Sequence, residues 1–304
     1  MDLRDYQREA QLTDQFASRA DALPVDHRII PLLGIAGEAG SLLAEYKKWL
    51  RDGPAHVLFP DQVAEELGDI LWYLANAAAR FDLDLDVIAR LNLDKTRDRW
   101  PPEGSQLEYR LFDEGRDPSE QLPRRFRAEI RDDPESDGKA RVNLTIDGHP
   151  AGSSLQDNSH DPDGYRFHDV LHLAHAAKLG WSPVVRGVLL KRKDQDPPSR
   201  KRRSDPELDE VEDGGRAIVI DEAVVAYVWE YAKRHNFLSG VTTVDYQILK
   251  TIKHLTGGLE VSARSAHDWG QAILAGYEVW RHVSAHGGGL IDVDLEHRTI
   301  RLVS

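Results

Sequence analysis

Residues 64–74 read AEELGDILWYL, and their pattern predicts an amphipathic helix. The apolar residues recur every three or four positions, as on one face of a helix: Val63, Leu67, Ile70, Leu71 and Leu74. Pro60 stands where this helix would begin, because proline is tolerated in the first helical turn. Glu66 and Asp69 are three residues apart, so they project together from the edge of the apolar stripe.

Three more helices are predicted in the first hundred residues. The first covers residues 3–20, and the second runs from about residue 27 to a Gly53-Pro54 stop. Asp84 is a suitable cap for the fourth, which the two prolines at 101–102 end. Short connections between long helices are typical of an antiparallel bundle. We therefore expect a four-helix bundle in this part of the chain.

The sequence changes character after about residue 104. Two alternating runs, 126–130 and 140–146, flank a turn-like segment and predict a β-hairpin or small sheet. Helical spacing returns in three stretches: 165–179, 212–234 and 262–284. Residues 290–303 have the pattern of two short strands joined by a turn.

The predicted fold class is mainly α. We expect an N-terminal four-helix domain at 1–103, a β-hairpin or linker region at 104–160, and a C-terminal α+β domain at 161–304. The last of these is predicted to be mostly helical with small β elements.

The chain has 304 residues, with 52 Asp and Glu against 39 Lys and Arg, and a formal net charge of −13. This acidity makes nucleic acid an unfavourable partner. Cysteine is absent, so any metal must bind carboxylates or imidazoles. The charged N-terminus lacks a signal-peptide pattern, and no run of about 18 apolar residues predicts a membrane helix. We expect a cytoplasmic protein without a membrane partner.

Glu38 lies in GIAGEAGSLLAEYKK, residues 34–48, on the second predicted helix. If Glu38 faced Glu66 and Asp69 across the bundle, the carboxylates would repel one another unless a divalent cation lay between them. Oxygen ligands suit Mg²⁺, with Mn²⁺ as an alternative. Acidic residues on amphipathic helices also commonly face solvent, and spacing alone leaves that alternative open.

Four ordered segments, one on each predicted helix, carry a resemblance to a known family: Tyr6-Gln7, GIAGEAG with Lys47-Lys48, ELGDILWYLAN and NLDKTRDRWP. The first hundred residues resemble the MazG-type domain of the all-α nucleoside triphosphate pyrophosphohydrolases. The resemblance implies a magnesium-dependent hydrolase that acts on phosphoanhydride bonds. Its substrates would be (deoxy)nucleoside triphosphates, cleaved to monophosphate and pyrophosphate in nucleotide-pool cleaning or nucleotide depletion. Family members form dimers or tetramers, so a homo-oligomer is expected.

By this resemblance, the metal ligands come as E-x-x-E on one helix and E-x-x-D on the next. Glu38, Glu66 and Asp69 match three of these positions, but Ser41 stands at the fourth. Serine is a weak, neutral ligand, so the lost carboxylate should weaken a multi-magnesium site. Glu45 lies one turn beyond Ser41 on the same face and is a candidate replacement. Glu38 and Glu66 are the candidate catalytic residues that would orient the attacking water.

Substrate contacts are expected on the third and fourth helices. Asn92, Lys95 and Arg99 share one face of the fourth helix, where two cations are suited to phosphate oxygens. A solvated helix end is the alternative explanation, since cations also favour the C-terminal end of the helix dipole. Asn76 continues the face of Glu66 and is a candidate contact for base or sugar.

Residues 164–180, GYRFHDVLHLAHAAKLG, place His168, His172 and His175 at positions i, i+4 and i+7 of one helix, beside Asp169. Two histidines four residues apart can chelate a transition metal. The candidates for a third ligand are Glu210, Glu212, Asp213 and Glu222. The alternative is that the histidines are core residues hydrogen-bonded to the acidic segment.

Residues 165–183 and 209–223 are similar to the C-terminal extension of some longer MazG-related proteins, from which no activity carries over. Between them, residues 191–203 contain seven Lys or Arg. This run is either a solvated loop or a segment that steers polyphosphate or a nucleic-acid end. The alternative function is a nucleotide-sensing module whose first site is degenerate at Ser41. That module would regulate a metal-dependent phosphohydrolase or effector in the C-terminal domain.

Overall fold

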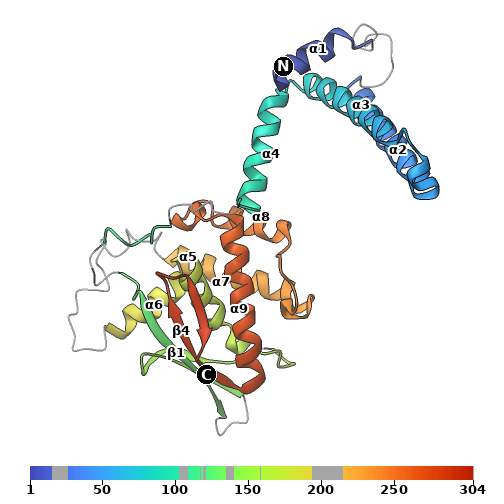
Figure 1. The fold of residues 1–304 in the computed structure, drawn as a ribbon. Helices are drawn as coiled ribbons and strands as arrows, with labels where there is room; N and C mark the ends of the chain where they lie inside the picture. Colours follow the sequence, from blue (N-terminus) through green and yellow to red (C-terminus); the bar gives the residue numbers. More distant parts are fainter. Residues whose placement is uncertain are drawn as a thin grey trace. The chain divides into compact units, whose positions relative to one another are not determined.

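A computed structural model describes residues 1–15, 27–102, 109–116, 118, 121–134, 140–157, 159–193 and 215–303. The chain separates into two compact units, Met1–Arg97 and Asp98–Ser304. Within the described residues there are nine α-helices and one five-stranded antiparallel sheet (Figure 1). The fold class is therefore mainly α, with an α+β second unit, as the sequence predicts.

The first unit consists of four helices: Leu3–Leu12 (α1), Ile29–Asp52 (α2), Phe59–Arg80 (α3) and Leu85–Arg99 (α4), the last of which ends in the second unit. Pro60 lies in the first turn of α3, and Gly53, with a φ of 57°, ends α2. The Asp84 carboxylate accepts hydrogen bonds from the backbone N–H groups of Asp86 and Val87 at the start of α4. These boundaries confirm the predictions for α2, α3 and α4.

Helix α1 is shorter than the predicted 3–20 and ends at Leu12. The hydroxyl of Thr13 donates to a backbone carbonyl three residues earlier, and it accepts a hydrogen bond of 2.8 Å from the indole N–H of Trp72 on α3. This contact holds the end of α1 against α3. Residues 16–20 of the predicted helix lie outside the described residues.

Helices α2 and α3 pack side by side (Figure 1). Gly34 permits their close approach, since a Cβ there would lie 2.3 Å from the ring of Tyr73 on α3. The buried apolar core of this unit is small and consists of Ala10, Ala75 and Leu85. Large apolar side chains of α2, α3 and α4 are exposed, among them Leu43, Leu50, Leu67, Leu74 and Leu91. A closed four-helix bundle is thus not seen in the described residues, because side chains that would fill its core face outward.

The sheet of the second unit has the strand order β3-β2-β1-β4-β5. Its strands are Arg125–Pro134 (β1), Ala140–Ile146 (β2), His149–Leu155 (β3), Gly288–Asp294 (β4) and Thr299–Leu302 (β5). The β1-β2 and β4-β5 pairs confirm the two predicted hairpins. Because β4 pairs with β1, the predicted regions 104–160 and 161–304 contribute strands to the same sheet.

The described part of the second unit also has five α-helices: Asp169–Leu179 (α5), Pro183–Lys193 (α6), Gly215–Lys233 (α7), Tyr246–Leu255 (α8) and Ala266–His286 (α9). Helices α5, α6 and α9 contact the sheet, and α7 and α8 pack on other helices. A short 3₁₀ turn, Tyr165–Phe167, precedes α5. Helices α5, α7 and α9 correspond to the three predicted helical stretches, whereas α6 and α8 were not predicted.

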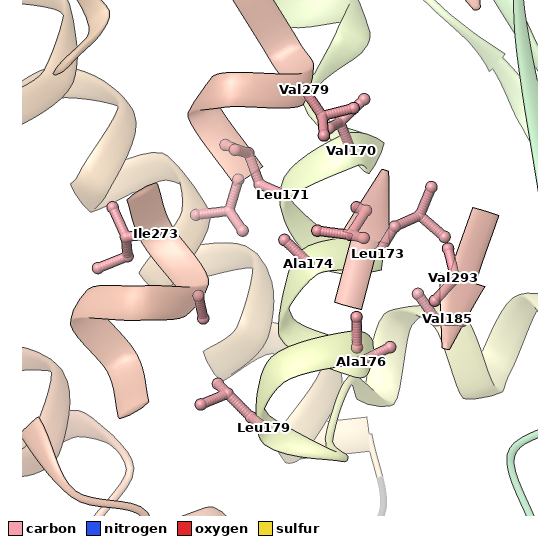
Figure 2. Packing of buried hydrophobic residues seen from close by; sticks show 14 of the residues in the cluster. Val170, Leu171, Leu173, Ala174, Ala176, Leu179, Val185, Ile273, Val279 and Val293 are labelled. Atoms are coloured by element: carbon pink, nitrogen blue, oxygen red, sulfur yellow. The ribbon is translucent and has the colours of Figure 1, made fainter. Parts of the chain in front are cut away.

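Helix α5 lies at the centre of the core. Figure 2 shows its apolar side chains packed among residues of α6, α9 and β4, including Val185, Ile273, Val279 and Val293. Nearly every residue of α5 is buried. Polar side chains on this helix must therefore find partners inside the unit, since an unpaired buried polar group is costly.

The segment Ile29–Ala55, which includes α2, is long and apolar enough to cross a membrane by length and composition alone. The same helix carries the charged residues Glu38, Glu45 and Lys48 and packs against α3.

Candidate functional site

Two of the predicted carboxylates, Glu38 on α2 and Glu66 on α3, face each other across the helix pair. They are close enough for the charge of Glu38 to act on Glu66. Desolvation raises the pKa of Glu66, and the negative charges of Glu38 and Asp69 raise it further. Asp69 follows Glu66 by one turn and is exposed. Partial burial raises the pKa of the Tyr6 phenol on α1, and the charge of Asp69 raises it further. The structure thus brings Glu38 and Glu66 together, with Asp69 one turn away.

Ser41 and Glu45 follow Glu38 on successive turns of α2. Ser41 is half-buried, whereas Glu45 is buried. The side chain of Lys48 donates to one carboxylate oxygen of Glu45, and a ring nitrogen of His56 lies 3.0 Å from the other. The hydrogen bond from Lys48 is the main cause that lowers the pKa of Glu45. Both oxygens of Glu45 therefore have protein partners.

The predicted substrate contacts are divided between the units. Asn76 is buried on α3; its amide N–H donates to a backbone carbonyl, and its Oδ1 has no hydrogen-bond partner among the described residues. Asn92 and Lys95 are exposed on α4 within the first unit. Arg99 belongs to the second unit, where its guanidinium lies 4.2 Å from the ring centre of Trp100.

A second group of polar residues gathers in the core of the second unit. His168, His172 and His175 are all buried along α5, and they meet Asp221 and Glu222 of α7. The other predicted third ligands lie outside the described residues: Glu210, Glu212 and Asp213. The basic run also lies outside them from residue 194 onward.

The ring of His168 is oriented by the turn before α5. Its Nδ1 lies 2.8 Å from the carbonyl oxygen of Tyr165, which can only accept, so Nδ1 carries a proton. Its Nε2 then faces Glu222 and Asp169, at 3.8 and 3.9 Å from their carboxylate oxygens. Burial raises the pKa of Asp169, although His168 and His172 oppose this.

Asp221 is the buried anchor of the group. Its Oδ1 lies 2.9 Å from Nδ1 of His175, and its Oδ2 accepts a hydrogen bond of 2.8 Å from the hydroxyl of Ser182. Burial alone would raise the pKa of Asp221, but His172 and His175 outweigh it and lower the pKa. His175 thus behaves as a core histidine bonded to an acidic residue.

His172 lies between the two acidic residues of α7. Its Nδ1 is 3.1 Å from Oδ2 of Asp221 and its Nε2 is 3.4 Å from Oε2 of Glu222. Neither nitrogen makes a hydrogen bond of acceptable geometry. Burial would lower the pKa of His172, but the carboxylates outweigh it and raise the pKa to about 10. Contact with His172 in turn lowers the pKa of Glu222.

Sequence reasoning named Glu222 among four alternatives and missed Asp221 and Ser182. A signal was present, because an acidic pair interrupts the apolar run AIVIDEAVVAYV, residues 217–228. Charged residues are rarely retained in such a run without a partner. Ser182 carries no comparable signal, since only the fold brings it to Asp221.

Comparison with known proteins gives two matches. The profile of the MazG C-terminal domain family matches residues 107–304, which include the sheet and helices α5–α9. The Gene 37 protein of Mycobacterium phage L5 is 31% identical over 96 residues, or 31% of this chain and 84% of that protein. No solved structure shows significant similarity to the chain.

Proposed function

The chain belongs to the MazG C-terminal domain family, and from this premise we propose that its first unit hydrolyses (deoxy)nucleoside triphosphates to monophosphate and pyrophosphate. The observation that carries the proposal is the pairing of Glu38 with Glu66 across α2 and α3. The negative charge of Glu38 disfavours the charged form of Glu66, so a cation between them would relieve the repulsion. This site supports cleavage of a phosphoanhydride bond in a nucleotide-pool or nucleotide-depletion role.

The available donors fit Mg²⁺, with Mn²⁺ as a substitute, because all of them are oxygens. Glu38, Glu66 and Asp69 would hold the ion, and Ser41 would contact it through water. When bound, the metal neutralises phosphate charge and makes a water more acidic. Glu45 is left out of this set, since Lys48 and His56 occupy both of its oxygens.

The remaining predicted residues of the first unit have distinct roles in this proposal. Glu38 and Glu66 would orient the attacking water. Lys95 and Asn92, exposed on α4, would contact phosphate oxygens. Asn76, whose Oδ1 has no hydrogen-bond partner in the described part of the chain, would contact the base or sugar. A cytoplasmic location suits an enzyme that acts on the nucleotide pool.

The test is a panel of each NTP and dNTP with Mg²⁺, assayed for pyrophosphate. We expect Glu66→Gln to abolish turnover, because it removes one carboxylate of the facing pair. Glu65→Gln is the matched control: it makes the same chemical change at an exposed neighbour on α3 and should retain activity. Absence of pyrophosphate with every substrate, or equal activity in the two variants, would refute the proposal.

Ser41 favours a second candidate, a module that binds nucleotide without turnover. A neutral residue at a ligand position reduces the negative charge available to the metal. We expect Ser41→Glu to raise kcat if the wild-type site is an enzyme with a weakened metal site. Saturable nucleotide binding by calorimetry, with no pyrophosphate from either the wild type or Ser41→Glu, would instead select the binding module.

A homo-oligomer, either a dimer or a tetramer, is part of the proposal. The first unit exposes many large apolar side chains on α2, α3 and α4 over a very small core. Exposed apolar surface of this kind marks an interaction site. A second copy of the same helices would supply the surface that closes the bundle.

A further inference from the structure

We propose that the second unit binds one divalent transition-metal ion of the zinc class through Nε2 of His168, Nε2 of His172 and the carboxylate of Glu222. This inference is independent of nucleotide hydrolysis in the first unit. It concerns a different set of residues and a different class of metal.

The spacing of the three ligand atoms suits a shared metal. Ligands about 2.0–2.2 Å from a tetrahedral ion are separated from one another by about 3.3–3.5 Å. Nε2 of His172 lies 3.4 Å from Oε2 of Glu222, and Nε2 of His168 lies 3.8 Å from the same oxygen. All three ligand atoms lie within 4.8 Å of one another. Small side-chain rotations would complete the geometry.

Both histidine rings are oriented as metal ligands usually are. A ligating histidine commonly directs its second nitrogen to a carbonyl or carboxylate, which fixes the tautomer. Nδ1 of His168 is bonded to the carbonyl of Tyr165 at 2.8 Å, and Nδ1 of His172 lies 3.1 Å from Asp221. The Nε2 atoms are therefore the ones directed toward the proposed ion. Asp221 is itself held by Ser182, which gives this support a rigid base.

His172 provides an independent observation that points to a ligand. Its side chain is 1% exposed, and neither ring nitrogen has a hydrogen bond among the described residues. Buried polar groups are normally satisfied. A metal on Nε2 would satisfy that atom and draw Nδ1–H into a hydrogen bond with Asp221. The side chain of Glu222 is 46% exposed, so an ion can reach the site from solvent.

The donor set selects the class of metal. Two imidazoles and one carboxylate favour zinc, iron, cobalt or manganese over magnesium. Three protein ligands leave one position open, which is typical of catalytic rather than structural zinc sites. Asp169 lies next to one of these ligands, with its Oδ1 3.9 Å from Nε2 of His168.

Among the described residues, two other groups could hold a metal by proximity alone. In the first, His172 is shared with His175 and Asp221, which are buried and already bonded to each other. In the second, Asp294 lies close to two exposed residues, and its carboxylate forms an ion pair with Arg125 at 2.9 Å. Neither combines open access with an unsatisfied ligand.

The rival explanation is an ion pair in which protonated His172 balances Asp221 without any metal. Metal content separates the two. We expect purified, untagged full-length protein to retain about one zinc-class ion per chain, by elemental analysis after dialysis. Chelated protein should bind Co²⁺ with the visible absorption of a tetrahedral ion. Wild-type protein that neither retains nor rebinds a metal would overturn the proposal.

Substitutions that keep the shape of the side chain can locate the metal site without leaving a cavity in the core. Glu222→Gln and His168→Gln keep the approximate shape of each side chain, and we expect both to lose the metal while near-ultraviolet circular dichroism shows an unchanged fold. Asp221→Asn should weaken Co²⁺ affinity by about 10- to 100-fold, because it removes the support of His172. His254→Ala, at an exposed histidine of α8, is the matched control and should bind normally.

An adventitious surface site is the remaining outcome to separate. His282 and His286 are exposed on α9 with ring centres 4.0 Å apart, so they could also chelate a metal. Loss of the metal in His282→Ala, together with its retention in Glu222→Gln, would overturn the assignment. Glu66→Gln should leave Co²⁺ binding unchanged, which distinguishes this site from the first unit.

Discussion

At the scale of single residues, the carboxylate of Asp268 stabilises the start of helix α9. It accepts a hydrogen bond from the backbone N–H of Ser265 at 3.0 Å, and its own N–H donates to the Ser265 hydroxyl at 3.0 Å. Arg298, from the turn between β4 and β5, donates to its other oxygen at 2.5 Å. Burial would raise the pKa of Asp268, but Arg298 and Ser265 outweigh it and lower the pKa below the usual 3.8.

We expect Asp268→Asn to lower the free energy of unfolding of the second unit by about 2 kcal/mol at pH 7. Because the folded-state pKa is depressed, the charge stabilises the fold above pH 3.8, and this stabilisation is lost as the pH falls through the lower folded value. The gap between wild type and variant should therefore shrink in acid. Urea unfolding at pH 7 and at about pH 3 measures it. Glu278→Gln, on the exposed face of α9, is the control; a gap that stays constant with pH would contradict the prediction.

Pairs of interacting residues could be predicted only where a sequence pattern indicated them. Glu38, Glu66 and Asp69 follow from helical spacing and the family resemblance, and the structure places Glu38 against Glu66. The role of Glu45 did not follow, because its partner His56 approaches from the turn after α2. Asp221 was likewise missed, since its position facing His172 and His175 depends on how α7 packs on α5.

At the scale of elements, the contact between α2 and α3 controls the carboxylate pair. Gly34 lies against the Tyr73 ring, one turn before Glu38, and a Cβ there would lie 2.3 Å from that ring. Gly37, by contrast, has nothing within 4 Å of its added Cβ. Two glycines in the same helix thus have opposite tolerance to substitution.

We expect Gly34→Leu to separate α2 from α3 and to reduce pyrophosphate release by at least about tenfold, because misplacement by an ångström is costly in catalysis. No carboxylate is altered by this change. Gly37→Ala should retain activity and stabilise α2 by up to about 1 kcal/mol, since alanine is the better helix former. Turnover assays and thermal unfolding of both variants provide the measurement. Full activity in Gly34→Leu would show that the helix spacing does not control the site.

Elements were predicted where side-chain periodicity was strong. Strand β3, HPAGSSL, lacks apolar alternation and contains proline and glycine, so it is held chiefly by backbone pairing at the edge of the sheet. Helix α6 was not predicted, and its last three residues overlap the basic run that begins at residue 191. Helix α8 has an Asp245 cap that accepts from the backbone N–H of Gln247, a signal that could have revealed it.

At the scale of the whole molecule, the two units differ in how fully they bury their apolar residues. The second unit has an extended core that joins the sheet to α5–α9, and the 107–304 family match falls within it. In its described part, the first unit has only a small core cluster and exposes large side chains such as Leu67 and Leu74. Buried apolar area is the main source of folding free energy, so the units should differ in their ability to fold alone.

We expect a fragment of residues 98–304 to unfold cooperatively as a monomer and to keep its Co²⁺ site, because its core and all three proposed ligands lie inside it. A fragment of residues 1–97 should instead associate, since only a second copy can cover its exposed leucines. Light scattering over a concentration series measures the oligomeric state of both fragments. Leu74→Glu should weaken the association by placing a charge in the interface, whereas Glu9→Gln on α1 should not. A monomeric, cooperatively folded 1–97 fragment would contradict the argument, because it would show that the exposed surface needs no partner.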